Sequence, residues 1–278
     1  MSSTPDDALS IFGGTGFVGG RFVELAARPC VVVPRAERTP PTADVLYFIS
    51  TTHNYHVFDD LHVDIDTNLG VLVDVLAKLT PGRSVFNFVS SWFVYGEGPL
   101  PATEDTPCHP KGFYSITKRA AEQLLISYCQ TFGIRWRILR LSNVYGPGDR
   151  SVSARRNAVQ YLVNRMRNGE EVGLYHDGEF TRDYLHVDDA ARALELCVTH
   201  GPLDSIINVG SGVATRFRDV IELAHGLLGS TSVVKAMEPP PFHQVVQVKD
   251  FHMDTRRLKA LGFEPRISLK EGIATLCR

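Results

Sequence analysis

The chain has 278 residues, of which 44% are hydrophobic and 22% are charged, and its formal net charge is −2. This composition fits one large α/β unit with a sizeable core, and the near-neutral charge gives no bulk attraction to nucleic acid or to a membrane surface. No apolar run approaches the roughly 20 residues of a membrane span, so we expect neither a nucleic acid nor a membrane as a partner. The five cysteines are scattered, which predicts reduced thiols and a cytoplasmic location, and the absence of Cys-x-x-Cys and His-Glu-x-x-His predicts no metal site.

A glycine-rich turn lies near the start of the chain. An apolar run at 8–12 leads into Gly13-Gly-Thr-Gly16-Phe-Val-Gly19, and a helical pattern follows. Gly13 permits left-handed dihedrals, Gly16 lets backbone amides approach a pyrophosphate, and Gly19 lets the helix pack close to the strand. The amides and the positive helix end favour phosphates, although a purely structural turn is the alternative. The predicted dinucleotide contacts are Gly13, Thr15, Gly16, Phe17, Val18 and Gly19.

The next strand, at 30–33, ends in Pro34-Arg35-Ala-Glu37-Arg38. At this place in a dinucleotide-binding unit, an acid accepts the ribose 2′-hydroxyl and an arginine accommodates a 2′-phosphate. Arg35 and Arg38 therefore favour NADP(H), with Arg35 as the predicted contact. Glu37 leaves NAD(H) open, and solvated loop charges are the third interpretation.

A strand at 44–50 follows after only a short proline-rich stretch, which cannot hold a full strand–helix unit. Either one parallel strand is missing or the sheet is rearranged at this edge. The spacing then predicts a helix over 68–79 and a near-continuous apolar strand over 85–91, as in a parallel sheet that is covered on both faces.

Ser91 ends that strand, and a later helix carries Tyr114-Ser-Ile-Thr-Lys118. Residues at i and i+4 share one helix face. A lysine ammonium beside a phenol lowers the pKa of the phenol and supports proton transfer, and the Ser91 hydroxyl can bind the reacting oxygen. Alone, such a pair is more simply a surface contact. The glycine turn and Ser91 favour the catalytic interpretation.

The rest of the chain alternates less regularly. We expect strands at 136–142, 172–175 and 206–210 and helices at 158–166, 190–198 and 217–228. The predicted fold is an α/β, doubly wound, mostly parallel Rossmann-type sheet with a smaller C-terminal substrate lobe. We assign 8–150 plus 184–212 to the dinucleotide-binding domain and 151–183 plus 213–278 to the lobe, with the substrate between them.

Several motifs together resemble one known family. They are Gly13-Gly-Thr-Gly16-Phe-Val-Gly19, Ser90-Ser91…Val94-Tyr95-Gly96, Tyr114…Lys118, Arg140-Leu-Ser-Asn143-Val-Tyr-Gly-Pro147, Thr181-Arg182-Asp183…Val187-Asp188-Asp189 and Asn208-Val-Gly-Ser-Gly212. Over nearly its whole length the chain resembles an extended short-chain dehydrogenase/reductase of the NAD-dependent epimerase/dehydratase type. This resemblance implies a nucleotide-diphosphate sugar as substrate and a homodimer built on the helices at 68–79 and 114–128.

The resemblance also implies roles for individual residues. Tyr114 corresponds to the general acid/base, Lys118 to the group that binds the nicotinamide ribose, and Ser91 to the group that polarises the sugar oxygen. The implied substrate contacts are Ser91, Trp92, Asn143, Asn157 and Arg182. Two of these have simpler alternatives: Asn157 as a helix N-cap, and Arg182 in a surface pair with Asp183 or Glu179.

One departure from the family narrows the activity. The 4,6-dehydratases carry Thr-Asp-Glu where this chain has Ser91-Trp92-Phe93, and neither aromatic residue can act as the acid or base that elimination needs. We therefore expect a 4-ketoreductase that uses Tyr114 as proton donor. A 4-epimerase with the same residues and a non-catalytic dinucleotide-binding sensor or scaffold are the alternatives. The sequence reveals neither the base nor the sugar.

Overall fold

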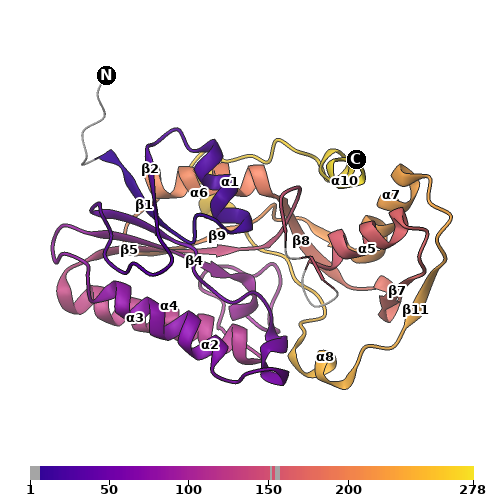
Figure 1. Cartoon of the computed structure of the whole chain (residues 1–278), viewed down its shortest axis with the longest axis horizontal. Coiled ribbons are helices and arrows are strands. Elements are labelled where there is room, and N and C mark those ends of the chain that lie inside the picture. The colour runs from indigo at the N-terminus through magenta and orange to yellow at the C-terminus, as the bar shows by residue number, and fades with distance from the viewer. Residues whose placement is uncertain (1–6, 151, 154–156) are drawn as a thin grey trace.

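The computed structural model describes residues 7–150, 152–153 and 157–278. Its centre is a six-stranded sheet in which all neighbouring strands run parallel. Across the sheet the strands are β2 (Cys30–Val33), β1 (Leu9–Phe12), β3 (Asp44–Tyr47), β4 (Val85–Ser91), β5 (Arg135–Leu141) and β9 (Ser205–Val209). Helices cover both faces (Figure 1). The predicted doubly wound, mostly parallel Rossmann-type sheet is therefore confirmed.

The sheet has no strand outside β2 in the described chain, whereas the usual dinucleotide-binding unit has one. β1 pairs with β2 on one side and with β3 on the other, and β2 is the last strand. Residues 34–43, between β2 and β3, contain neither a helix nor a strand. Of the two alternatives at this edge, the missing strand is correct.

Two helical layers enclose the sheet (Figure 1). One contains α1 (Phe17–Leu25) and α6 (Val187–His200), which pack against each other, with α9 (Arg256–Ala260) beside β9. The other contains α2 (Val63–Ile65), the π-helical η3 (Asp66–Gly70), α3 (Val71–Leu76) and α4 (Phe113–Phe132). Each face has its own buried apolar cluster.

The helix expected at 68–79 begins earlier and is interrupted by the π-helical turn. That turn contains Asn68, a buried amide. Asn68 Oδ1 accepts the Thr51 amide at 2.8 Å, and its Nδ2 donates to Thr117 Oγ1 at 2.9 Å. The widened turn thus places a polar group between the β3 loop and α4, which the apolar spacing did not indicate.

A third apolar cluster lies beyond the carboxyl ends of the strands. It is built by α5 (Ala158–Arg167), α7 (Phe217–Leu228), α10 (Leu269–Cys277), the sheet β10 (Ala214–Arg216)–β8 (Thr181–His186)–β6 (Asn143–Tyr145) and the pair β11 (Val234–Met237)–β7 (Val172–Tyr175). Leu258 and Phe263, late in the chain, pack instead into the α1/α6 cluster. The domain boundaries given above remain a prediction.

Short helical turns connect these layers: η2 (Asn54–Phe58), η4 (Trp92–Val94), η5 (His176–Gly178) and α8 (Pro241–Val246). α8 begins at the last residue of the Pro239-Pro-Pro241 run. Pro241 is its first residue, a position at which proline suits a helix because its missing N–H would be unpaired there. In the described part of the chain no helix is long and apolar enough to cross a membrane.

Candidate active site

The glycine turn has the geometry that a pyrophosphate needs. Gly13 has φ +79°, and a Cβ on Gly19 would collide with the Gly13 carbonyl oxygen. α1 begins after Gly16, which provides no side-chain cap, and its first turn has no acidic residue. The first amides of α1 are therefore available to an anion, and the positive end of the helix supports its charge. A side chain at Gly19 would push α1 away from the turn.

Ser91, Tyr114 and Lys118 meet at the carboxyl end of β4. Ser91 is the last residue of β4 and its hydroxyl accepts the Phe93 amide at 3.3 Å. Tyr114 and Lys118 lie one turn apart on α4, and both are buried. The Tyr114 backbone amide donates to Asn54 Oδ1 at 3.0 Å, so η2 fixes the start of α4.

Lys118 is enclosed by protein. Its Nζ donates to the Val89 carbonyl oxygen at 2.7 Å and lies 4.0 Å from the centroid of the Phe88 ring. Burial lowers the pKa of Lys118 to about 7, and the carboxylate of Glu122, one turn further along α4, acts in the opposite direction. The ammonium is therefore oriented but close to losing its proton at neutral pH.

A buried ion pair between Glu122 and Arg140 lies one turn along α4 from Lys118. Arg140 Nε and Nη2 donate to the two oxygens of Glu122 at 3.0 and 2.8 Å, and Ser90 Oγ donates to Glu122 at 2.6 Å. These contacts lower the pKa of Glu122 despite its burial. They join α4 to β4 and β5, next to Ser91 in β4 and one turn after Lys118 in α4. Sequence analysis quoted Arg140 only as part of a motif and did not identify Glu122.

Arg182 lies in the other half of the site. Its guanidinium donates to the backbone carbonyl oxygens of Thr181, Val248 and Lys249 at 2.8, 2.7 and 2.6 Å. Among the described residues no carboxylate lies within ion-pair distance of it. Burial lowers its pKa to about 10, which still leaves it charged at neutral pH.

The surface pairs considered for Arg182 are not formed. Glu179 pairs with Arg216, at 3.1 Å. Asp183 accepts the backbone amides of Ser211 and Gly212 at 2.8 and 3.0 Å. Both carboxylates are therefore engaged elsewhere, and Arg182 retains an unneutralised charge.

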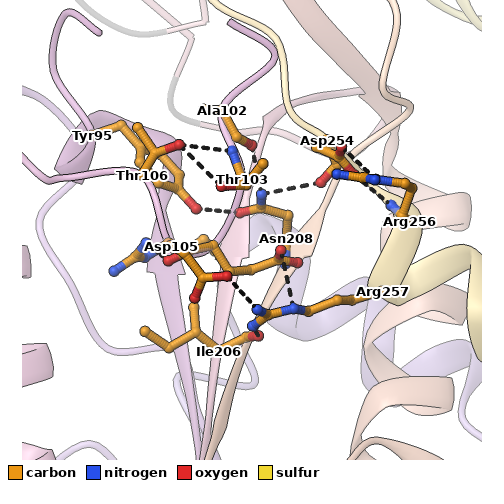
Figure 2. Close-up of polar contacts among 12 residues, drawn as sticks. Tyr95, Ala102, Thr103, Asp105, Thr106, Ile206, Asn208, Asp254, Arg256 and Arg257 are labelled. Carbon is orange, nitrogen blue, oxygen red and sulfur yellow. Dashed lines mark hydrogen bonds and ion pairs between the residues drawn. The ribbon is translucent and has the colours of Figure 1, made fainter. Parts of the chain in front are cut away.

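The Asn208 side chain connects β9 to two neighbouring segments of the chain, as Figure 2 shows. Tyr95 Oη donates to Asn208 Oδ1 at 2.6 Å, and Asn208 Nδ2 donates to the carbonyl oxygens of Ala102 and Asp254 at 2.9 and 3.1 Å. Asn208 thus attaches Asp254, which ends the segment that follows the Val248 and Lys249 carbonyl groups, to β9. Its contribution to the site is structural.

Ser142 and Asn143, which follow β5, each have a buried polar atom that makes no hydrogen bond within the described residues. These atoms are Ser142 Oγ and Asn143 Nδ2. Asn157 is the N-cap of α5, where its Oδ1 accepts the Gln160 amide at 3.4 Å. The capping role of Asn157 is therefore present, and it does not prevent the side chain from lining the site.

One cavity of about 730 Å³ lies at the carboxyl ends of the strands. It includes most of the predicted site residues: Gly13, Gly16, Phe17, Val18, Gly19, Ser91, Trp92, Tyr114, Lys118, Asn143, Asn157 and Arg182. Thr15 and Arg35 are exposed and do not line it, and their roles remain predictions. Within the described residues no group of three His, Cys, Asp or Glu side chains could hold a metal ion.

The loop after β2 uses most of its charges internally. Glu37 Oε1 accepts the amides of Arg38 and Thr39, both at 2.7 Å, and these bonds lower the pKa of Glu37. Arg38 Nη1 donates to the carbonyl oxygens of Arg35 and Glu37 at 2.8 and 3.0 Å. Arg35 is thus the most available of the three for a ligand.

Sequence analysis missed a group of cavity residues from η2 and α8, among them His53, Asn54, Tyr55 and His243. They lie in short elements without a periodic pattern and come together only in the folded chain. The concentration of aromatic and imidazole side chains in 53–58 was the available signal.

Comparison with known proteins places this geometry in a family. Residues 57–210 match the model of the NAD dependent epimerase/dehydratase family. The dTDP-glucose 4,6-dehydratase of Streptomyces antibioticus is 30% identical over 279 residues, 99% of this chain and 77% of the relative. The GDP-6-deoxy-D-mannose reductase of Pseudomonas aeruginosa is 27% identical over 293 residues, 96% of this chain and 95% of the relative.

A solved structure has the same fold. The UDP-glucose 4-epimerase of Thermotoga maritima, determined with UDP-glucose, superposes with a TM-score of 0.84 at 23% identity, over 97% of each chain. Dehydratase, reductase and epimerase are thus all represented among the similar proteins. The family match and the identity to the Streptomyces relative lead to one conclusion: the chain belongs to the NAD-dependent epimerase/dehydratase family.

Proposed function

We propose that this protein is an NAD(P)-dependent oxidoreductase of a nucleotide-diphosphate sugar that acts as a 4-ketoreductase. The observation that carries the proposal is the shared cavity, which joins Tyr114, Lys118 and Ser91 to the buried, unneutralised Arg182. A proton donor and an anion-binding cation therefore border one space. The reductase from Pseudomonas, similar over nearly its whole length, supports this assignment.

The residues present fit a nicotinamide dinucleotide. The close approach of α1 to the glycine turn at Gly19 and the uncapped amides of α1 suit a pyrophosphate. Lys118 would hold the nicotinamide ribose, and Arg35 would hold the 2′-phosphate of NADP(H). When bound, the nicotinamide supplies or accepts a hydride.

The chain's own groups handle the proton. The Tyr114 hydroxyl donates its proton to the C4 oxygen of the sugar as that oxygen gains negative charge, and the Lys118 ammonium stabilises the phenolate that remains. Ser91 donates a hydrogen bond to the same oxygen. Arg182 holds the diphosphate, because a guanidinium binds phosphate oxygens through several donors at once. Asn143 Nδ2, buried without a partner, can bond either ligand.

Trp92 and Phe93 argue against elimination. Their rings stack with centroids 4.0 Å apart, and neither can exchange a proton. A reductase needs no further acid or base beyond Tyr114. An epimerase also needs none, and the fold shared with the Thermotoga epimerase makes 4-epimerisation the second candidate. The intact Ser91, Tyr114 and Lys118 count against a non-catalytic sensor.

Two measurements test the proposal. The nucleotide that copurifies with the protein is identified by mass spectrometry, and matching 4-keto nucleotide sugars are then supplied with NADPH. A reductase consumes one NADPH for each sugar reduced. Interconversion of two C4 epimers without net consumption would identify an epimerase, and binding without either reaction would identify a sensor.

A further inference from the structure

Two elements meet at the mouth of the substrate cavity. η2 follows the β3 strand on the Rossmann side, and α8 belongs to the segment that returns from β11 (Figure 1). Tyr55 of η2 and His243 of α8 both line the cavity although they are 188 residues apart in sequence. Their contact therefore joins two parts of the cavity wall that come from opposite ends of the chain.

Tyr55 and His243 are joined by a hydrogen bond and surrounded by rings. Tyr55 Oη lies 3.0 Å from His243 Nδ1, and the Tyr175 ring lies 4.7 Å from the imidazole. On the outer side, Phe242 packs 5.2 Å from Tyr55 and 4.7 Å from Phe58, centroid to centroid. The aromatic neighbours Phe58 and Phe242 do not line the cavity.

His243 is a neutral group in this setting. Burial lowers its pKa to about 4, and the positive charges of Arg182 and His176 act in the same direction. The groups that face it from η2 and β7 are the phenols of Tyr55 and Tyr175. When the Tyr55 hydroxyl donates to Nδ1, the imidazole proton resides on Nε2. No described residue accepts a hydrogen bond from Nε2.

The position of Tyr55 relates this donor to the reacting end of the substrate. Asn54, its chain neighbour, accepts the backbone amide of Tyr114. The loop that orients His243 thus also fixes the start of α4, and His243 and Tyr114 line the same cavity. A neutral N–H there suits an uncharged oxygen, whereas the diphosphate already has Arg182.

We propose that His243 is a specificity-determining residue that donates Nε2–H to a hydroxyl or carbonyl oxygen of the sugar. Tyr55 is its positioning residue and selects the tautomer. This inference rests on the proposed function, because it assumes a nucleotide sugar in the cavity. It adds a recognition contact from α8 to the sugar itself.

Calorimetry on the full-length protein loaded with NADH tests the inference. UDP, dTDP, CDP and GDP are titrated beside UDP-glucose, dTDP-glucose, CDP-glucose and GDP-mannose, and the pair that binds most tightly is kept. His243→Ala should lower the affinity for the nucleotide sugar by about three- to tenfold, which corresponds to one neutral hydrogen bond. Binding of the matching nucleoside diphosphate should change less than twofold, on the order of the scatter for an untouched contact.

Two further variants separate recognition from packing. Tyr55→Phe should weaken binding of the nucleotide sugar and leave binding of the nucleoside diphosphate unchanged. If Tyr55 acts through the imidazole, the same substitution should cause no further loss of affinity in the His243→Ala protein. Phe242→Leu, the matched control, disturbs the aromatic cluster outside the cavity and should leave the sugar preference unchanged. The inference is overturned if His243→Ala affects both ligands equally or neither, or if Phe242→Leu has the same effect. A wild-type protein that binds none of the eight compounds overturns the proposed function, and this inference with it.

Discussion

The guanidinium of Arg182 lies over the indole of Trp92, 5.1 Å from the ring centroid, and over the Phe180 ring at 4.7 Å. Two aromatic faces and three backbone carbonyl groups therefore hold a charge that no carboxylate of the described chain neutralises. Burying such a group is costly, because desolvation opposes the charged form, and a bound anion would offset that cost. This arrangement makes Arg182 the strongest candidate for binding an anion in the cavity.

Arg182→Ala should weaken nucleotide-sugar binding about tenfold or more, since charge-assisted hydrogen bonds are worth about 1.5–3 kcal/mol each. Binding of the nicotinamide cofactor should stay near normal, because the glycine turn is untouched. Calorimetry with the nucleoside diphosphates measures the first affinity, and calorimetry with NADPH measures the second. Arg182→Lys is the matched control, which keeps the charge and loses the planar donors. Equal affinities in wild type and Arg182→Ala would remove the diphosphate assignment.

Tyr114→Phe should reduce turnover by about 10²–10⁴-fold, the usual contribution of general acid–base catalysis. The ring remains to pack against Phe93, whose centroid lies 6.1 Å away, so the fold and cofactor binding should be preserved. Steady-state rates and a cofactor titration on the same preparation check this expectation. A variant with wild-type turnover shows that another group donates the proton.

The protonation of Lys118 should appear in cofactor binding. Its pKa is lowered to about 7 by burial, so the ammonium is present below that pH and is lost above it. If the ammonium binds the ribose, the affinity for NADPH should fall as the pH rises from about 6 to about 9. The same titration on Lys118→Met provides the baseline. An identical slope in that variant would assign the pH dependence to other groups.

Cofactor preference should depend on Arg35. Glu37 is occupied by two backbone amides of its own loop, and Arg38 is bound to two carbonyl oxygens. We expect tighter binding of NADPH than of NADH, and Arg35→Ala should lower only the NADPH affinity. Fluorescence titration of the cofactor-free protein measures both. Tighter NADH binding by the wild type would reverse the preference and indicate Glu37 as the ribose ligand.

A homodimer is expected from the uncovered apolar side chains of the α2–α4 layer. They include Ile65, Val73, Ile116 and Leu124, which are 43, 49, 50 and 43% exposed. Burying them against a second copy would be favourable in proportion to the apolar area removed from water. Light scattering at micromolar concentration should give twice the monomer mass, and Ile116→Glu with Leu124→Glu should give the monomer. A monomeric wild type would refute the expectation.

The main sheet could be read from the sequence because its strands are apolar runs. The predicted strands at 30–33, 85–91 and 172–175 and the helix at 217–228 have the observed bounds. β6 and β10 are three residues long and too short to show a period. β8 buries Arg182 and Asp183, which conceals its strand character. Its pairing depends on the tertiary structure rather than on local preference.

Only those candidate site residues that belong to a short sequence motif could be predicted. Gly13, Ser91, Tyr114 and Lys118 belong to short patterns whose chemistry depends on neighbours in sequence. The bond between Glu122 and Arg140 joins a helix to a strand, and that between Tyr55 and His243 spans most of the chain. Such contacts follow from topology, which spacing does not encode.

Because no strand covers β2, the loop that follows it also affects whether this sheet edge can pair with another chain. The outer side of β2 faces no other strand of the described chain, and Val31 and Val32 are 40 and 36% exposed. An open edge of this kind can recruit a strand from another copy and start aggregation. Pro34, which has no amide, and the charge of Arg35 end the strand and discourage such pairing. Engineering a different cofactor preference at Arg35 would therefore also alter the protein's resistance to aggregation.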